Sequence, residues 1–224
     1  MFLSENIFFC YYVIMYKKSF ILCESLIYIT FIVFDILNKD SLYIKYLGIV
    51  VCFLFSLKSK NIASIALATT LCADFFLLVL NKHYEIGLLF FIITQLTYCF
   101  YLNNKNYLYV RFICFVFGLI VLFVANNISL LNVLVIFYFS NLLINCIESF
   151  KLKDKTLFVG LLLFVCCDIC VGLFNTNVST SLYNFVSFMM WVFYLPSQVL
   201  ICLYFFDNRQ YIKYKNPVTN QDKG

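Results

Sequence analysis

Two aspartates lie inside apolar stretches of the chain, where an ionised carboxyl group is costly. Asp74 stands in LATTLCADFFLLVL and Asp168 in FVCCDICVGLF. An aspartate at the centre of a membrane-spanning helix costs about 2.5–3.5 kcal/mol, so it should face protein or water and have a partner. The chemistry of such a carboxyl group is the binding of a proton or an ion. We therefore take Asp74 and Asp168 as the candidate functional pair.

The composition places these acids in a membrane protein. Of the 224 residues, 64% are hydrophobic and only 12% are charged, whereas roughly half of an average soluble protein is apolar. Apolar runs long enough to cross a hydrocarbon core about 30 Å thick as helices fill nearly all of the chain. The sequence predicts an all-α polytopic transmembrane bundle with about eight spans. The net charge of +5 is explained by membrane topology, so we expect no nucleic-acid partner.

Three parts of the chain are expected. Residues 1–18 are apolar but contain Glu5 and end in Lys17 and Lys18, which favours an interfacial helix over a ninth span. Residues 19–206 form the membrane domain, and residues 207–224 form a polar cytoplasmic tail. The predicted spans are residues 19–38, 42–57, 62–80, 84–102, 108–125, 128–147, 156–174 and 183–206.

The basic residues support this topology. Thirteen of the sixteen lysines and arginines fall on one side of the predicted bundle, and Lys39, Lys45 and Lys82 fall on the other. Cytoplasmic loops carry an excess of these residues. We therefore predict an integral membrane protein with both termini in the cytoplasm, in a bacterial plasma membrane.

The two acids share a position within their spans. Each lies twelve residues after the start of its predicted span, or about 18 Å along the helix axis. The two spans run in the same direction, so the acids are expected at the same depth. The sequences around them also match at an offset of 94 residues, with Cys72, Asp74 and Asn81 aligned to Cys166, Asp168 and Asn175. A parallel internal repeat would explain this match, and chance similarity between apolar helices is the alternative.

Other polar side chains recur three, four or seven residues apart, which is the spacing of one helix face. These faces hold Thr70, Asp74 and Asn81; Gln95 and Tyr98; Tyr138, Asn141, Asn145 and Glu148; and Tyr194 and Gln198. Several polar faces together predict a shared interior cavity, since amides and acids that face lipid would be unpaired. Hydrogen bonding between helices explains Asn141, Asn145 or Gln95 equally well when each is taken singly.

Three further positions carry expectations about their surroundings. Glu148 and Asp35 lie near span ends, where interfacial solvation is the simplest explanation for a charge. Gly172 lies one turn after Asp168, and the missing side chain permits close approach of a neighbouring helix there.

No pattern typical of a metal or cofactor site is present. Most of the eleven cysteines lie within spans, and the chain has one histidine, so neither a disulfide framework nor a zinc site is indicated. The GxSxG, HExxH, P-loop and dinucleotide-binding motifs are absent. We expect neither a metal nor a cofactor.

A series of short motifs follows in order along nearly the whole chain. The series comprises Lys58 before the third span, Ala73-Asp74, Gly87-Leu88-x-x-Phe91 leading to Gln95 and Tyr98, Tyr138, Leu163-Phe164-x-x-Cys167-Asp168, and Tyr194 to Gln198. With these motifs the chain resembles the YhhN family of eight-span membrane proteins, which includes the lysoplasmalogenases. It departs from the family pattern at Ser59, where the family has proline, and at Gln95, where the family usually has histidine. Glutamine can form hydrogen bonds but cannot titrate.

The resemblance implies hydrolysis of the vinyl-ether bond of lysoplasmalogens to a fatty aldehyde and a glycerophospho-alcohol. Asp74 and Asp168 would be the catalytic acids, one protonated and the other ionised. The substrate-binding residues would be Gln95, Tyr98, Tyr138, Asn141, Tyr194 and Gln198, with Lys58 and Lys60 at the lipid phosphate. The implied partner is a lysophospholipid within the membrane.

Two other functions stay open at this point. In a proton- or ion-coupled transporter, Asp74 and Asp168 would bind the ion at a pseudo-symmetric site. In a membrane sensor or scaffold, the acids would serve only to hold helices together.

Overall fold

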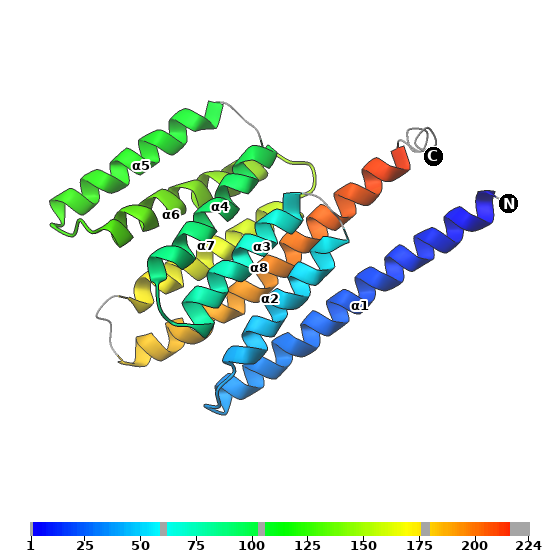
Figure 1. Cartoon of the computed structure of the whole chain (residues 1–224), viewed down its shortest axis with the longest axis horizontal. Helices are drawn as coiled ribbons and strands as arrows, with labels where there is room; N and C mark the ends of the chain where they lie inside the picture. Colours follow the sequence, from blue (N-terminus) through cyan, green and yellow to red (C-terminus); the bar gives the residue numbers. More distant parts are fainter. Residues whose placement is uncertain (1, 59–61, 103–105, 176–179, 216–224) are drawn as a thin grey trace.

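The structure is a computed structural model that describes residues 2–58, 62–102, 106–175 and 180–215, and the elements in these ranges are all helices (Figure 1). Lys60 and the end of the predicted tail lie outside the described residues. The helices are α1 (Phe2–Ile36), α2 (Leu42–Leu57), α3 (Ile62–Asp74), the π-helix η1 (Phe75–Val79), α4 (Tyr84–Leu102), α5 (Asn106–Val124), α6 (Leu130–Ser149), α7 (Thr156–Phe174) and α8 (Thr180–Lys215).

Length and hydropathy qualify seven stretches of these helices as membrane spans. They are Val13–Ile36, Ile62–Val79, Tyr84–Leu102, Tyr107–Val124, Leu130–Ser149, Thr156–Phe174 and Leu182–Asn208. Helix α2 is apolar but has only 16 residues, or about 24 Å at 1.5 Å per residue. A helix satisfies its own backbone hydrogen bonds, which lipid cannot do. The predicted all-α transmembrane bundle is thus confirmed, and the chain is an integral membrane protein.

The first and last helices extend past the boundaries expected from the sequence. Helix α1 runs without a break from Phe2, so residues 1–18 do not form a helix separate from the first span. Helix α8 continues to Lys215, beyond the expected end at residue 206. Neither boundary holds a proline or glycine that would end a helix. The two extensions meet where Lys17 Nζ lies 2.5 Å from Asp207 Oδ2.

The tight turns between helices rest on asparagine and on short polar side chains. Asn38 after α1 and Asn126 after α5 adopt φ values of 53° and 50°, a left-handed conformation that asparagine tolerates at helix ends. Ser129 caps α6 by accepting a hydrogen bond from the backbone N–H of Asn132 at 3.1 Å.

Helices that follow one another in the sequence run in opposite directions (Figure 1). Helix α7 packs along α8 and α3 along α4, α6 contacts α4, α5 and α7, and α2 contacts α1, α3 and α8. The close approach of α7 to α8 occurs at Gly160, where a Cβ atom would lie 3.2 Å from the carbonyl oxygen of Ser197. Gly172 also permits a close approach, but no neighbouring atom of the described residues lies within 4 Å of its Cβ position.

Helix α8 contains a proline whose missing N–H is compensated from another helix. Pro196 cannot donate to the carbonyl of Val192, one turn earlier. The Tyr28 hydroxyl of α1 donates to that carbonyl oxygen at 3.2 Å. Satisfying a backbone carbonyl in this way lets proline lie inside a membrane-spanning helix, and it ties α1 to α8.

Candidate functional site

Asp74 stands where one helix changes its geometry. It is the last residue of α3, and the next five residues form η1. A π-helical turn inserts an extra residue into the helix and is frequent at functional sites. Helix α4 packs closely on this turn, because a Cβ atom on Gly87 would lie 2.6 Å from Leu77 Cγ and 3.2 Å from the carbonyl oxygen of Ala73. The side chain of Asp74 is therefore placed by a locally fixed backbone.

The structure brings the two acids together. Asp74 is 3% exposed and accepts a hydrogen bond from the Tyr194 hydroxyl of α8, with Oη and Oδ2 2.6 Å apart. Asp168 of α7 lies close enough to interact electrostatically with Asp74. Three helices that are far apart in sequence thus contribute to one carboxyl cluster.

Asp168 faces a second tyrosine without closing a hydrogen bond of ordinary geometry. The Tyr138 hydroxyl of α6 lies within electrostatic reach of the Asp168 carboxyl group. Both the hydroxyl oxygen and Asp168 Oδ2 are buried, and neither has a hydrogen-bond partner in the part of the chain that the structure describes. Buried polar atoms in proteins are usually satisfied by a partner, water or ligand. The Tyr138 hydroxyl and Asp168 Oδ2 are therefore the polar atoms of this cluster that can still form a hydrogen bond.

Aromatic rings pack on the two tyrosines beside the acids. Phe91 lies with its ring centroid 5.7 Å from Tyr138 and 5.9 Å from Phe164, and Phe164 contacts Tyr194 at 5.5 Å. Trp191 packs edge-on against Tyr194 at 5.4 Å. Two carboxylates repel each other strongly in such low-dielectric surroundings, so a proton held by one of them is favoured. The arrangement suits transfer of a proton to an apolar ligand.

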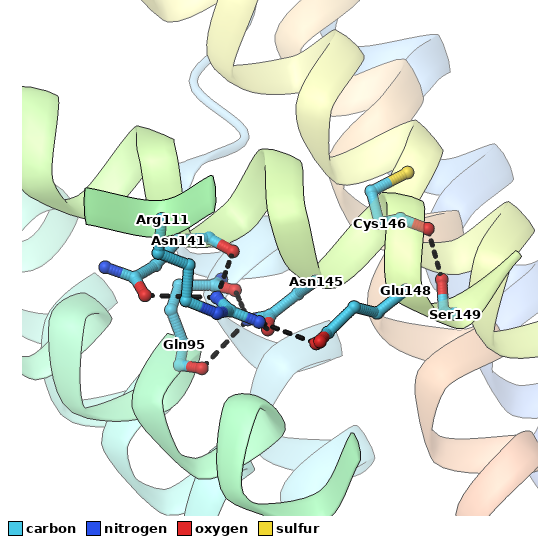
Figure 2. A network of polar contacts seen from close by, with 7 residues as sticks. All are labelled: Gln95, Arg111, Asn141, Asn145, Cys146, Glu148 and Ser149. Carbon is cyan, nitrogen blue, oxygen red and sulfur yellow. Dashed lines mark hydrogen bonds and ion pairs between the residues drawn. The ribbon is translucent and has the colours of Figure 1, made fainter. Parts of the chain in front are cut away.

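A second polar cluster surrounds Arg111 of α5 (Figure 2). Its Nη1 donates to the carbonyl oxygen and to Oδ1 of Asn141, both at 3.1 Å. Its Nη2 donates to Asn145 Oδ1 and to Glu148 Oε2, both at 2.7 Å. Asn145 Nδ2 in turn donates to the carbonyl oxygen of Gln95 at 2.8 Å and to its Oε1 at 3.0 Å. This Arg111 network joins α5, α6 and α4.

The network overturns the expectation for Glu148. Interfacial solvation does not account for this acid, because it is 5% exposed and paired with the buried Arg111. Asp35 is paired as well, with its Oδ2 2.8 Å from Lys45 Nζ. Both charges lie near helix ends, yet packing withdraws them from solvent, and a buried charge requires a partner.

The remaining predicted site residues are Asn141, Tyr98, Gln198 and Lys58. Asn141 belongs to the Arg111 network, and its Nδ2 donates to the carbonyl oxygen of Phe137 at 2.8 Å, so both ends of its amide are occupied. Tyr98 and Gln198 are fully buried, and Tyr98 Oη and Gln198 Oε1 have no hydrogen-bond partner among the described residues. Lys58 is exposed at the end of α2, where its Nζ lies 4.1 Å from the ring centroid of Tyr16.

Sequence reasoning missed Arg111 as a member of a polar cluster. The sequence identified Arg111 only as one of the thirteen basic residues on one side of the predicted bundle. The stripe of Asn141, Asn145 and Glu148 carries a carboxylate and two amide oxygens on one face, and a buried set of acceptors calls for a side chain rich in donors. Arginine has five N–H donors and no acceptor. Arg111, six residues into α5, was the available candidate.

Within the described residues, no group of three or more His, Cys, Asp or Glu side chains comes together as metal ligands would. The acid cluster is therefore described by its carboxyl, hydroxyl and aromatic groups.

The segment that matches a known protein family contains both the acid cluster and the Arg111 network. The model of the YhhN family matches residues 41–205, a segment that holds both acids and Gln95. Neither a curated protein nor a solved structure gives a significant match. The matched segment is well over half of the 224 residues and runs from the start of α2 into α8. The chain therefore belongs to the YhhN family.

Proposed function

We propose that the protein is a lysoplasmalogenase, which hydrolyses the vinyl-ether bond of lysoplasmalogens. The observation that carries the proposal is the pair of acids from α3 and α7, buried together among aromatic rings. The match to the YhhN family supports it. A membrane-embedded site suits a substrate that resides in the bilayer, because the lipid can reach the bundle laterally.

The reaction needs a proton donor and a base at one place. The protonated carboxyl group of the pair delivers its proton to the vinyl carbon remote from the ether oxygen, which forms an oxocarbenium ion. The ionised carboxylate stabilises this cation and removes a proton from the attacking water. The resulting hemiacetal collapses as its hydroxyl proton is lost and the glycerol oxygen is protonated. The products are a fatty aldehyde and a glycerophospho-alcohol, and one water is consumed.

This division of labour parallels that of glycosidases, in which two carboxyl groups flank a similarly cationic transition state. The Tyr194 hydroxyl holds Asp74 in place. The unpartnered oxygens of Tyr138 and Asp168 are the groups available to a water or to the substrate. Phe91 and Phe164 supply an apolar surface for the alkenyl chain.

The direct test is release of fatty aldehyde from a lysoplasmalogen by purified protein without any ion gradient. We expect release by the parent protein and loss of at least a hundredfold in kcat in each of the variants Asp74→Asn and Asp168→Asn. Asparagine has nearly the same shape but cannot supply or accept the proton. Full activity in either variant, with its thermal unfolding unchanged, would refute the acid-pair mechanism.

A second function has one specific observation in its favour. The α3 helix changes to π geometry directly after Asp74, and interrupted helices at acidic residues are typical of ion-coupled transporters. Helix α7, which carries Asp168, has no such interruption between Thr156 and Phe174, so the pseudo-symmetric counterpart is missing. Uptake into sealed vesicles that depends on a proton gradient, without aldehyde release, would establish the transporter instead.

A further inference from the structure

Gln95 presents a hydrogen-bond donor for which the structure holds no acceptor. The residue lies in the middle of α4 and is 0% exposed. Its Nε2 has no hydrogen-bond partner among the described residues. An amide that is buried with an unused donor costs free energy. The orientation of this amide therefore needs a cause, and the Arg111 network provides it.

The cause begins at Arg111, because a guanidinium group can only donate. The atom of Asn145 that faces Arg111 Nη2 at 2.7 Å must be the acceptor Oδ1. The other end of the Asn145 amide is consequently the donor Nδ2. Asn145 Nδ2 donates to the backbone carbonyl of Gln95 at 2.8 Å. Because a carbonyl can only accept, this second contact independently requires the same placement of the nitrogen and oxygen of the Asn145 amide.

The direction of the hydrogen bonds carries through to Gln95. Asn145 Nδ2 also lies 3.0 Å from the Gln95 side chain, so the atom there must be the acceptor Oε1. Gln95 Nε2 is then the end of the amide that has no protein partner. The chain of donors that starts at Arg111 thus ends in the NH2 group of Gln95, which has no acceptor among the described residues and requires an added one.

The charge of the network restricts what that acceptor is. Arg111 is neutralised by Glu148, whose Oε2 lies 2.7 Å from Nη2. Gln95 therefore offers a neutral donor without a net positive charge behind it, which favours an uncharged oxygen over a phosphate group.

The position of Gln95 relates this donor to the acid cluster. Phe91 is four residues earlier on α4, on the same helix face. Phe91 contacts Tyr138, the residue beside Asp168. Gln95 therefore lies four residues, or about 6 Å along the helix axis, from the residue whose ring packs on the tyrosine that faces Asp168.

We propose that Gln95 Nε2 is a fixed donor subsite for an uncharged glycerol oxygen of the lysolipid, either a hydroxyl or an ether oxygen. Asn145 and Arg111 are positioning residues that hold the amide in this orientation. The inference rests on the proposed function for the identity of the ligand. A fixed donor at this position also explains how glutamine replaces the histidine that is usual in the family. An imidazole at residue 95 would accept a hydrogen bond from Asn145 Nδ2 with one nitrogen and present the N–H of its other nitrogen to the ligand.

The test measures binding and turnover separately in nanodiscs. Binding of an ester-linked lysophospholipid is followed by the fluorescence of Trp191, the single tryptophan, which packs beside Tyr194. This probe has the glycerol oxygens but no vinyl ether, so binding is measurable whether or not the protein is a hydrolase. Aldehyde release from a lysoplasmalogen gives kcat and KM, and thermal unfolding confirms that each variant folds.

Four variants separate the donor from the bulk of the side chain. Gln95→Met removes the donor, and we expect Kd for the lysophospholipid to rise about tenfold. Gln95→His keeps a donor, and Kd should stay within about threefold of the parent. Asn145→Asp places an acceptor opposite Gln95, which turns the amide around, and Kd should rise about tenfold. Asn132→Asp makes the same amide-to-acid exchange on α6 at a residue whose side chain donates to Asn127, and Kd should stay near that of the parent.

Every outcome of these measurements either supports or overturns the Gln95 subsite. Parent-like binding by Gln95→Met, or equal effects of Asn145→Asp and Asn132→Asp, would overturn the proposal. A fall in kcat with Kd unchanged would assign the donor to a water rather than to the substrate, and this would also overturn it. The expected pattern of Kd values in a protein that releases no aldehyde would support the subsite while refuting the hydrolase.

Discussion

The Arg111–Glu148 ion pair is the most deeply buried pair among the described residues. The two side chains are 8% and 3% exposed. Removing one member of such a pair leaves an uncompensated buried charge, whereas replacing both by apolar side chains can be nearly neutral. The pair therefore contributes more to the specificity of helix packing than its own net stability indicates.

Single and double substitutions of Arg111 and Glu148 are expected to differ in their effect on stability. Arg111→Leu should destabilise the protein by about 3–5 kcal/mol, because Glu148 stays buried without its partner. The double variant Arg111→Leu, Glu148→Leu should recover most of that loss. Thermal unfolding in detergent measures both.

The pair Lys45 and Asp35 serves as the comparison, because its side chains are 13% and 14% exposed. Water reaches them more easily, so Lys45→Leu should cost less than Arg111→Leu. A double variant at 111 and 148 that is no more stable than Arg111→Leu would contradict this account of the network.

The π-helix η1 and its contact with α4 determine where Asp74 points. Leu77 fills the space that a side chain on Gly87 would need, and the carbonyl of Ala73 lies just beyond. The glycine is therefore required by packing against a specific turn. Gly172 on α7 has open space where a Cβ atom would lie. It therefore serves as a matched control for Gly87.

We expect Gly87→Ala to destabilise the protein by about 1–3 kcal/mol, since inserting a methyl group into a filled space forces the neighbouring atoms to shift. Activity should fall further than stability, because the displaced turn carries Asp74. Gly172→Ala should be neutral or slightly stabilising, as alanine favours helix. Measured unfolding midpoints and aldehyde release for the two variants check this, and equal effects would refute the packing argument.

Eight α-helices, with η1 continuing α3, alternate in direction along the described residues, so α1 begins and α8 ends at the same end of the bundle (Figure 1). The basic residues near that end, including Lys17, Lys18 and Lys58, outnumber Lys39, Lys45 and Lys82 at the other. The positive-inside rule then predicts that the end with both termini lies in the cytoplasm.

Reporter fusions in a bacterial host test this orientation. Green fluorescent protein fused after Gly224 should fluoresce, because the fusion stays in the cytoplasm. Alkaline phosphatase fused after Lys82 should be active, because that link is predicted to lie outside. Active phosphatase at a fusion after Gly224 would reverse the assignment.

The positions of the helices followed closely from the sequence. Predicted spans such as residues 42–57, 84–102 and 156–174 coincide with α2, α4 and α7. Hydrophobic periodicity and the need to satisfy the backbone in lipid are local properties, which a stretch of about 20 residues already expresses. The positions of Asp74 and Asp168 in the third and seventh spans followed for the same reason.

The partners of the polar side chains could not be obtained in this way. Tyr194 and Asp74 are 120 residues apart in the sequence, and Arg111 and Glu148 are 37 apart. Spacing indicated which face of a helix was polar, but which faces meet depends on how the helices pack across the bundle. The burial of Glu148, the open space at Gly172 and the direction of the amide of Gln95 were therefore decided by tertiary structure, because each depends on atoms that other helices contribute.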